Sequence, residues 1–90
     1  MKTYLLNIKG FVQGVSFRHY ANKKADELGI SGYAKNIKDG SLEILCTGKK
    51  SDLERFIDWC SKGPEDAKVK TIDVKEIEPD EKFSGFEIMH

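Results

Sequence analysis

The sequence predicts an α+β fold in which one antiparallel sheet carries two helices on one face. Three observations support this prediction. Apolar residues alternate at a period of two in several segments, they recur at helical spacing in two others, and Asp39-Gly40 marks a hairpin turn between two alternating segments. The resulting order is strand, helix, strand, strand, helix, strand, with a short final strand. Two βαβ-like halves of this kind build a two-layer, ferredoxin-like sandwich (βαββαβ), whose other sheet face we expect to be open to solvent.

Alternating apolar residues predict five strands. They are expected over Met1–Val12, Ile30–Lys38, Ser41–Gly48, Val69–Ile77 and Phe83–Met89. The core-facing residues predicted for the first strand and for the strand after the hairpin are Tyr4, Leu6 and Ile8, and Leu42, Ile44 and Cys46. The mixed apolar spacing of Val69–Ile77 indicates a β-bulge. A turn at Pro79–Lys82 precedes the last strand, in which Phe86 and Ile88 share one face.

Helical spacing predicts two helices. The first spans Phe17–Leu28, with a hydroxyl cap from Ser16 and a terminating glycine, Gly29. The second opens with a capping box at Ser51–Glu54 and ends at Gly63-Pro64. The predicted buried stripes consist of Phe17, Tyr20, Ala21, Ala25 and Leu28 on the first helix and of Leu53, Phe56, Ile57 and Cys60 on the second.

Composition favours one small domain, over residues 1–90, that binds neither nucleic acid nor a membrane. The chain contains 15 Lys and Arg and 15 Asp and Glu, so its net charge is zero and a basic surface is not expected. No apolar run approaches the ~20 residues that span a bilayer. The N-terminus lacks the pattern of a signal peptide. We therefore expect a cytoplasmic protein, and we expect a monomer.

The cysteines and carboxylates do not predict a metal site. Cys46 and Cys60 are the only cysteines, and each falls at an apolar-periodic position, so we expect both to be buried fillers. Two thiols alone do not form a zinc site. The carboxylates are scattered over helix faces and turns, without the facing pair that a hard cation needs.

The stretch from Gly10 to Arg18 is the first candidate site. It joins the first strand to the first helix and reads Gly-Phe-Val-Gln-Gly-Val-Ser-Phe-Arg. Glycine lets a ligand approach the backbone closely, and amide groups at a loop-to-helix junction bind anions. The Arg18 guanidinium is suited to two phosphate oxygens at once. The stretch therefore predicts a site for a phosphate-like dianion, with a tight turn and a surface arginine as the structural alternative.

Asn36 is the second candidate, on the strand that enters the hairpin. Asparagine is unfavourable inside strands, so its presence needs a reason. One interpretation is that Asn36 prepares the turn. The other is that its amide lies near the anion site and holds a water molecule. The spacing of the residues leaves both open.

Two stretches resemble the signatures of the acylphosphatase family. Gly10–Arg18 resembles the first signature, and Gly32–Glu43, which contains Asn36, resembles the second. The end of the chain, Gly85–Ile88, is similar to the family's closing strand. The resemblance covers essentially the whole chain and implies the ferredoxin-like sandwich.

The resemblance implies a hydrolase that cleaves the carboxyl–phosphate bond of acyl phosphates. Arg18 and Asn36 correspond to the family's catalytic residues. The backbone amides that correspond to its phosphate-binding loop belong to Gln13, Gly14, Val15, Ser16, Phe17 and Arg18. The implied partners are a small-molecule acyl phosphate as substrate and inorganic phosphate as product and inhibitor, with no cofactor and no metal. Phe11 and Ser16 differ from the residues common at these positions in the family. These differences affect the expected rim of the loop and the expected substrate preference, but not the phosphate site itself.

An acyl phosphate is an activated anhydride, so positioning and electrostatics can supply nearly all of the catalysis. Arg18 and the loop amides would clamp the phosphoryl oxygens, and Asn36 would orient the attacking water. No histidine, thiol or carboxylate nucleophile is then required. Because no proton acceptor is obvious, we hypothesise that the substrate's own phosphate takes the proton.

The same fold suggests other functions. A non-enzymatic RNA-binding module is the main alternative, although the expected open face lacks aromatic residues on which bases stack. The side chains expected on that face are Leu5, Asn7, Lys9, Glu43 and Leu45. A metal-transfer domain would need a Cys-x-x-Cys pair after the first strand. A domain that serves one step of carbamoyl transfer in a larger protein is a further alternative.

Three other features are weaker candidates. Gly48–Ser51 is similar to the end of a nucleotide-binding phosphate loop, but Glu43 stands where such a loop needs glycine. His19 is expected to point away from the site, because adjacent helical residues diverge by about 100°. His90 is terminal and is expected to be disordered.

Overall fold

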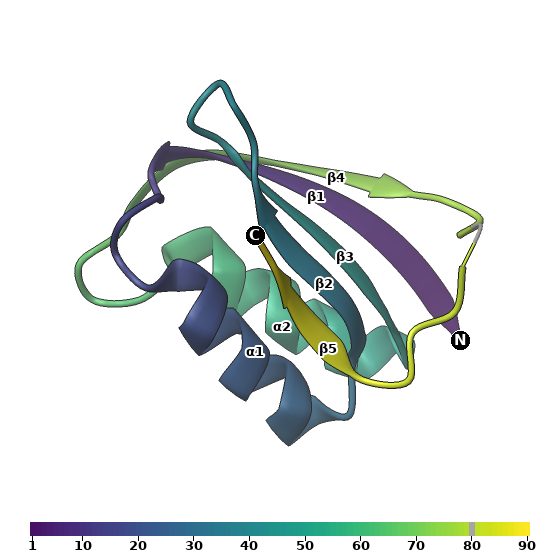
Figure 1. Cartoon of the computed structure of the whole chain (residues 1–90). Coiled ribbons are helices and arrows are strands. Elements are labelled where there is room, and N and C mark those ends of the chain that lie inside the picture. The colour runs from purple at the N-terminus through teal and green to yellow at the C-terminus, as the bar shows by residue number, and fades with distance from the viewer. Residues whose placement is uncertain (80) are drawn as a thin grey trace.

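The structure, a computed structural model, describes residues 1–79 and 81–90. Two helices pack on one face of a five-stranded sheet (Figure 1). The elements are β1 (Lys2–Phe11), α1 (Phe17–Leu28), β2 (Ser31–Asn36), β3 (Leu42–Gly48), α2 (Lys50–Lys62), β4 (Lys68–Glu76) and β5 (Phe86–Met89). The predicted order and the two-layer sandwich are confirmed. The turn predicted at Pro79–Lys82 includes Asp80, which lies outside the described residues.

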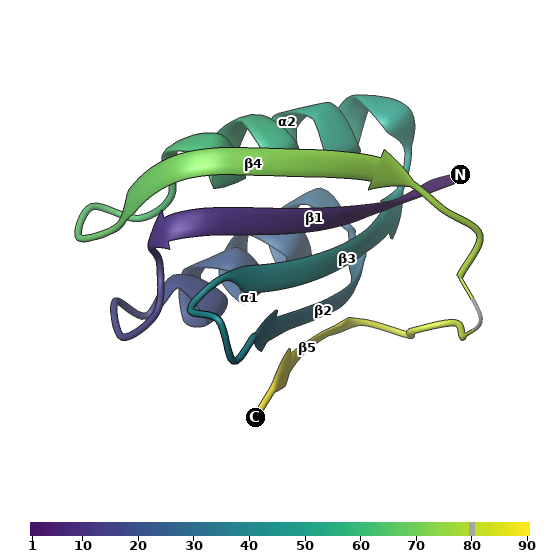
Figure 2. The ribbon, with the colours of Figure 1, turned by 90° about the horizontal axis from the view of Figure 1, so that it is seen from above.

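The predicted four-stranded antiparallel sheet is confirmed for β1 to β4, and the short final strand extends it in parallel, so the whole sheet is mixed. Its strand order is β4-β1-β3-β2-β5, with β4 and β5 at opposite edges (Figure 2). β1 pairs antiparallel with β3 and β4, and β2 with β3, as expected. The final strand pairs parallel with β2, with Ile88 opposite Ala34. The parallel pairing follows from the path of the chain. After β4, the chain crosses from one edge of the sheet to the other and then runs in the same direction as β2.

The core lies between the sheet and the helices. The residues that bury completely on the sheet include Leu6, Ile8, Leu42, Ile44 and Cys46, as predicted. On α1 the line of Phe17, Ala21 and Ala25 faces the sheet. Tyr20, predicted on the same stripe, is 46% exposed, and its ring lies against His19. The prediction for Tyr20 was wrong because the buried residues of α1 are spaced four apart. The small side chains of Ala21 and Ala25 pack against the sheet, and Tyr20 lies to one side of them, at the boundary with solvent.

Both cysteines lie in this core, as predicted. Cys46 is on β3 and Cys60 is on α2, and both are fully buried. Burial raises the pKa of the Cys46 thiol to about 12 and raises the pKa of Cys60 well above its usual value. Since the thiolate is the reactive form, both cysteines stay neutral and serve as packing residues.

The helix ends agree with the predictions at the C-termini and differ at the N-termini. Gly29 and Gly63 follow α1 and α2. Ser16 occupies the N-cap of α1, but its backbone is left-handed and its hydroxyl makes no capping hydrogen bond. The N-cap of α2 is Lys49, not Ser51, because the helix begins one residue before the predicted capping box. No helix in the described ranges is long and apolar enough to cross a membrane.

The predicted bulge lies in β4. The register between β1 and β4 shifts at Gly10, so that Lys70 is the extra residue. Gly10 has φ 133°, and a Cβ atom there would stand 2.2 Å from the carbonyl oxygen of Lys68. Only glycine fits this close approach of two main chains. The bulge therefore requires glycine at the second-last residue of β1, close to the loop that leads to α1.

The outer face of the sheet is partly covered, which corrects the expectation of a fully open face. Phe83, in the β4–β5 connection, packs edge to face on Tyr33, with ring centroids 5.6 Å apart. The Tyr33 hydroxyl donates a hydrogen bond of 2.8 Å to Glu43. Burial, and after it Glu43, raises the pKa of Tyr33 to about 12. Leu45, opposite Tyr33, is only 7% exposed.

Replacement of Gly10 by alanine should destabilise the fold. We expect Gly10→Ala to lower the free energy of unfolding by at least ~2 kcal/mol, because the substitution adds backbone strain and a main-chain clash. Urea denaturation measures this change. The matched control is Gly85→Ala, whose Cβ atom would meet nothing within 4 Å, so its effect should stay within about 0.5 kcal/mol. Equal stability of the two variants would contradict the geometric argument.

Candidate active site

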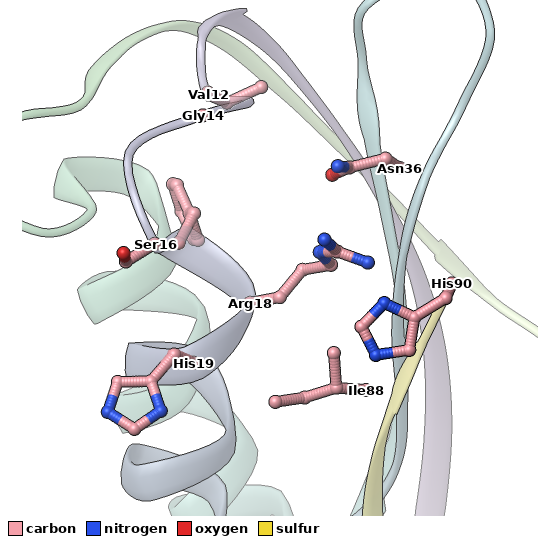
Figure 3. Close-up of a pocket in the computed structure, with 9 residues that line it drawn as sticks. Val12, Gly14, Ser16, Arg18, His19, Asn36, Ile88 and His90 are labelled. Atoms are coloured by element: carbon pink, nitrogen blue, oxygen red, sulfur yellow. The ribbon is translucent and has the colours of Figure 1, made fainter.

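Three segments that are distant in the sequence meet at one end of the sheet. The β1–α1 loop, the end of β2 and the end of β5 surround a cavity of about 390 Å³ (Figure 3). The residues that line it are Val12, Gly14, Ser16, Phe17, Arg18, His19, Asn36, Ile88 and His90. The loop and Asn36 were candidates from the sequence. The wall formed by β5 was not anticipated.

The β1–α1 loop lines this cavity and carries main-chain N–H groups that no described protein group accepts. Gly14 (φ 76°) and Ser16 (φ 61°) both adopt the left-handed conformation, which curves the backbone. Across the described part of the chain, the N–H groups of residues 13–19 donate no hydrogen bond to another protein group. The last of these groups belong to the first turn of α1, whose dipole favours negative charge. The loop can therefore bind an anion through its main chain.

Arg18 extends from the first turn of α1 toward β5. Its side chain is half-buried, and Nη1 donates a hydrogen bond to the carbonyl oxygen of Met89. This bond uses one of the five guanidinium donors and restricts the orientation of the planar group. In Figure 3 the guanidinium points into the space between α1 and β2. No sequence pattern indicates such a partner, because it is a main-chain oxygen 71 residues away.

Asn36 is the last residue of β2. It lies opposite the fully buried Leu42, and strand alternation places it on the helix-covered face with Ala34. Figure 3 shows its carboxamide on the same side as the Arg18 guanidinium, at the cavity. Within residues 1–79 and 81–90, no hydrogen bond joins this carboxamide to another protein group. The amide is therefore free to hold a small molecule.

The hairpin after Asn36 is closed by other residues. The Asp39 carboxylate accepts hydrogen bonds from the amide (2.9 Å) and the hydroxyl (2.6 Å) of Ser41. These bonds lower the pKa of Asp39. Asn7 on β1 donates a hydrogen bond of 3.2 Å to the Ser41 hydroxyl. The turn therefore does not use the side chain of Asn36, so the interpretation of Asn36 as a turn residue finds no support in these contacts.

Two residues of the predicted phosphate loop do not line the cavity. The side chain of Gln13 turns to the β2–β3 hairpin, where Nε2 donates to the carbonyl oxygens of Ile37 (2.8 Å) and Ser41 (2.9 Å). Val15 packs against the core. The other four members of the predicted loop, Gly14, Ser16, Phe17 and Arg18, are at the cavity surface. The prediction for Gln13 and Val15 concerned their backbone amides, which remain without protein acceptors in the described residues.

The two histidines differ in their relation to the site. His19 is exposed and, in Figure 3, points away from Arg18 and Asn36 as expected, although it contributes to the rim of the cavity. His90 was expected to be disordered at the terminus, and the structure places it at the cavity beside the end of β5. The physical reason is the pairing of Met89 with Lys35, which holds the last residues against β2.

The cavity is suited to a compact anion. Among its lining residues, as far as the structure describes them, there is no Asp or Glu. The described residues also contain no group of three or more His, Cys, Asp or Glu placed to hold a metal ion. A guanidinium and a set of main-chain N–H groups are the donors that recognise a phosphate-like dianion.

Comparisons with known proteins identify the family of the chain. The Acylphosphatase family model matches residues 4–88. The acylphosphatase of Shewanella amazonensis is 44% identical over 88 residues, which cover 98% of this chain and 97% of that relative. The crystal structure of acylphosphatase from Bacillus subtilis has a TM-score of 0.94 and 34% identity over 100% of both chains. The structure of T. kodakarensis HypF has a TM-score of 0.88 and 34% identity over 100% of this chain and 12% of that one. The chain belongs to the acylphosphatase family.

Proposed function

We propose that the chain hydrolyses acyl phosphates in this cavity, with Arg18 and the loop amides binding the phosphoryl group and Asn36 orienting the attacking water. Membership of the acylphosphatase family supports a hydrolase of acyl phosphates. One observation supports the assignment of residues: Arg18, Asn36 and the loop line the same cavity. In the described chain, the Asn36 carboxamide and the loop N–H groups have no hydrogen-bond partner in the protein.

The phosphoryl group would lie in the curve of the β1–α1 loop. The N–H groups at Gly14 to Arg18 would point at its oxygens, and the guanidinium would bind from the side of β5. Val12 and Phe17, at the two ends of the loop, are almost fully buried in the core. Their packing restricts movement of the loop and therefore of its N–H groups. Donors that are fixed before the reaction stabilise the charge that shifts to the phosphoryl oxygens in the transition state.

The water would attack phosphorus from the side of Asn36. The carboxamide oxygen can accept one water hydrogen, and the amide N–H groups can bind a phosphoryl oxygen or the water itself. As the new P–O bond forms, the bond between phosphorus and the acyl oxygen breaks, and the carboxylate leaves with that electron pair. One proton of the water stays on the new P–OH group, and the other passes to a phosphoryl oxygen. The products are a carboxylate and dihydrogen phosphate.

This reaction needs no metal ion in the proposed mechanism. The leaving carboxylate is stable without protonation, and the guanidinium supplies the positive charge that a cation supplies in many other phosphoryl transfers. The absence of carboxylates from the described cavity lining is consistent with this role of Arg18. Inorganic phosphate, as a product with the same donors available to it, would compete with the substrate.

The first test is phosphate release from a synthetic acyl phosphate. We expect turnover that EDTA leaves unchanged and that inorganic phosphate inhibits competitively. A stable phosphomonoester serves as the control and should not be cleaved. Its alkoxide is a poor leaving group that needs a proton donor, which the proposed mechanism does not include. Loss of turnover with EDTA, or equal attack on the monoester, would contradict the proposed mechanism.

Removal of the guanidinium should abolish most of the activity. We expect Arg18→Ala to lower kcat/KM at least about 10²- to 10³-fold, because loss of one fixed donor has this effect and Arg18 also carries charge. Inhibition by inorganic phosphate should weaken in parallel. Arg55→Ala removes the other arginine of the chain, which lies exposed on α2, and should keep wild-type kinetics. Substantial activity in Arg18→Ala would refute its role.

Removal of the carboxamide should affect turnover more than phosphate binding. We expect Asn36→Ala to fold normally and to lower kcat about 10²-fold, because the attacking water loses its orientation. The inhibition constant for inorganic phosphate should change little, since the loop and Arg18 remain. Asn22→Ala on α1 is the matched control and should leave both quantities unchanged. An Asn36→Ala variant that loses phosphate affinity but keeps kcat would reverse the assignment.

A further inference from the structure

We propose that the side chain of Gln13 is a positioning residue that fixes the phosphate loop relative to Asn36. This inference rests on the proposed function and concerns how its two halves are aligned. The phosphate would be bound by the β1–α1 loop, whereas the water would be oriented from β2. The two segments are not direct neighbours in the sheet, because β3 lies between β1 and β2, so catalysis requires a connection that sets their distance.

The Gln13 carboxamide makes that connection with both of its N–H groups. Nε2 lies 2.8 Å from the carbonyl oxygen of Ile37 and 2.9 Å from that of Ser41. Each of these oxygens already accepts one hydrogen bond within the hairpin: Ile37 from Gly40 at 3.0 Å, and Ser41 from Ile37 at 2.9 Å. Gln13 therefore uses the second lone pair of each carbonyl and bridges the two chains of the hairpin.

The bridge is attached next to Asn36 on both strands. Ile37 directly follows Asn36, and Ser41 directly precedes Leu42, the residue paired with Asn36. At the other end, Gln13 directly precedes Gly14, which lines the cavity. Among the described residues, these two bonds are the only hydrogen bonds between residues 12–16 and the β2–β3 hairpin. Gln13 is thus the side chain that hydrogen-bonds the loop to the hairpin beside Asn36.

Packing of Val12 and Phe17 holds the two ends of the loop, and the hydrogen bonds of Gln13 add support between them. The N–H groups of the loop are without protein acceptors in the described chain, and Gly14 allows wide backbone freedom. An error of about 1 Å in the placement of reacting groups can cost about 10² in rate. Glutamine has the length to reach both carbonyls and two donors to satisfy them. The role therefore fits glutamine and excludes residues that only accept hydrogen bonds.

Gln13→Met tests the bridge, since it keeps the length of the side chain and removes both donors. We expect kcat to fall about tenfold or more, while the inhibition constant for inorganic phosphate changes less than about threefold. The matched control is Thr3→Val, which removes a hydrogen bond of 2.7 Å to Thr47 at the other end of the sheet. If Gln13 only stabilises the fold, both variants will lose stability and keep wild-type kcat, and the inference is then wrong.

A double-mutant cycle with Asn36→Ala tests whether Gln13 acts through Asn36. When the carboxamide of Asn36 is absent, its alignment no longer matters. We therefore expect Gln13→Met to lower kcat less than about twofold in the Asn36→Ala background, in contrast to its effect in the wild type. Full additivity of the two substitutions would overturn the positioning role.

Gln13→Glu provides an independent readout and decides the question if Gln13→Met does not fold. A carboxylate facing two carbonyl oxygens is unfavourable, whereas the protonated acid donates one hydrogen bond. We expect the kcat of Gln13→Glu, relative to wild type, to rise as the pH falls from 8 to 5. A flat ratio contradicts the inference. If Arg18→Ala and Asn36→Ala keep activity, the proposed function is wrong. If these two variants lose activity but the Gln13 variants keep wild-type kcat, only the positioning role of Gln13 is wrong.

Discussion

The site depends on main-chain N–H groups that the fold leaves without protein acceptors in the described residues. Because the N–H groups of the β1–α1 loop make no hydrogen bonds within the described protein, other contacts have to hold the loop in place. Here the close approach of Gly10 to β4 fixes its beginning, the two bonds of Gln13 fix its middle, and the buried ring of Phe17 fixes its end. The left-handed Ser16 is the strained point of this arrangement, and such strain is common where a backbone is shaped for a ligand.

The sandwich brings three segments to one end of the sheet. The β1–α1 loop and β2 form part of the cavity, and β5, the edge strand beside β2, completes its lining with Ile88. Its parallel pairing with β2 places the carbonyl of Met89 at the Arg18 guanidinium. An arginine side chain is long and flexible, and ordering it costs about 1.5–2 kcal/mol of conformational entropy. The hydrogen bond to the Met89 carbonyl already restricts the Arg18 side chain, so the side chain loses less conformational entropy when a ligand binds.

The chemistry explains why so small a chain can carry such a site. An acyl phosphate already has a good leaving group, so in the proposed mechanism the protein aligns water and balances charge, and both tasks need only fixed donors. The two thiols are buried, and burial keeps their pKa values high, so they take no part. What the scaffold must provide is a fixed distance between the β1–α1 loop and the β2–β3 hairpin. The hydrogen bonds of Gln13, and those of Asp39 and Asn7 at Ser41, all stiffen the same hairpin.

The sequence by itself determined the order of elements, the core faces of β1 and β3, the glycine ends of the helices and the bulge in β4. Each follows from local periodicity or from the conformations that glycine allows. It also drew attention to Arg18 and Asn36 through residue type and resemblance. Only the tertiary structure decided the parallel β5, the exposure of Tyr20, the place of His90 and the contacts of Arg18 and Gln13. These depend on where distant segments return, and their acceptors are main-chain carbonyls, which every residue carries and no sequence pattern distinguishes.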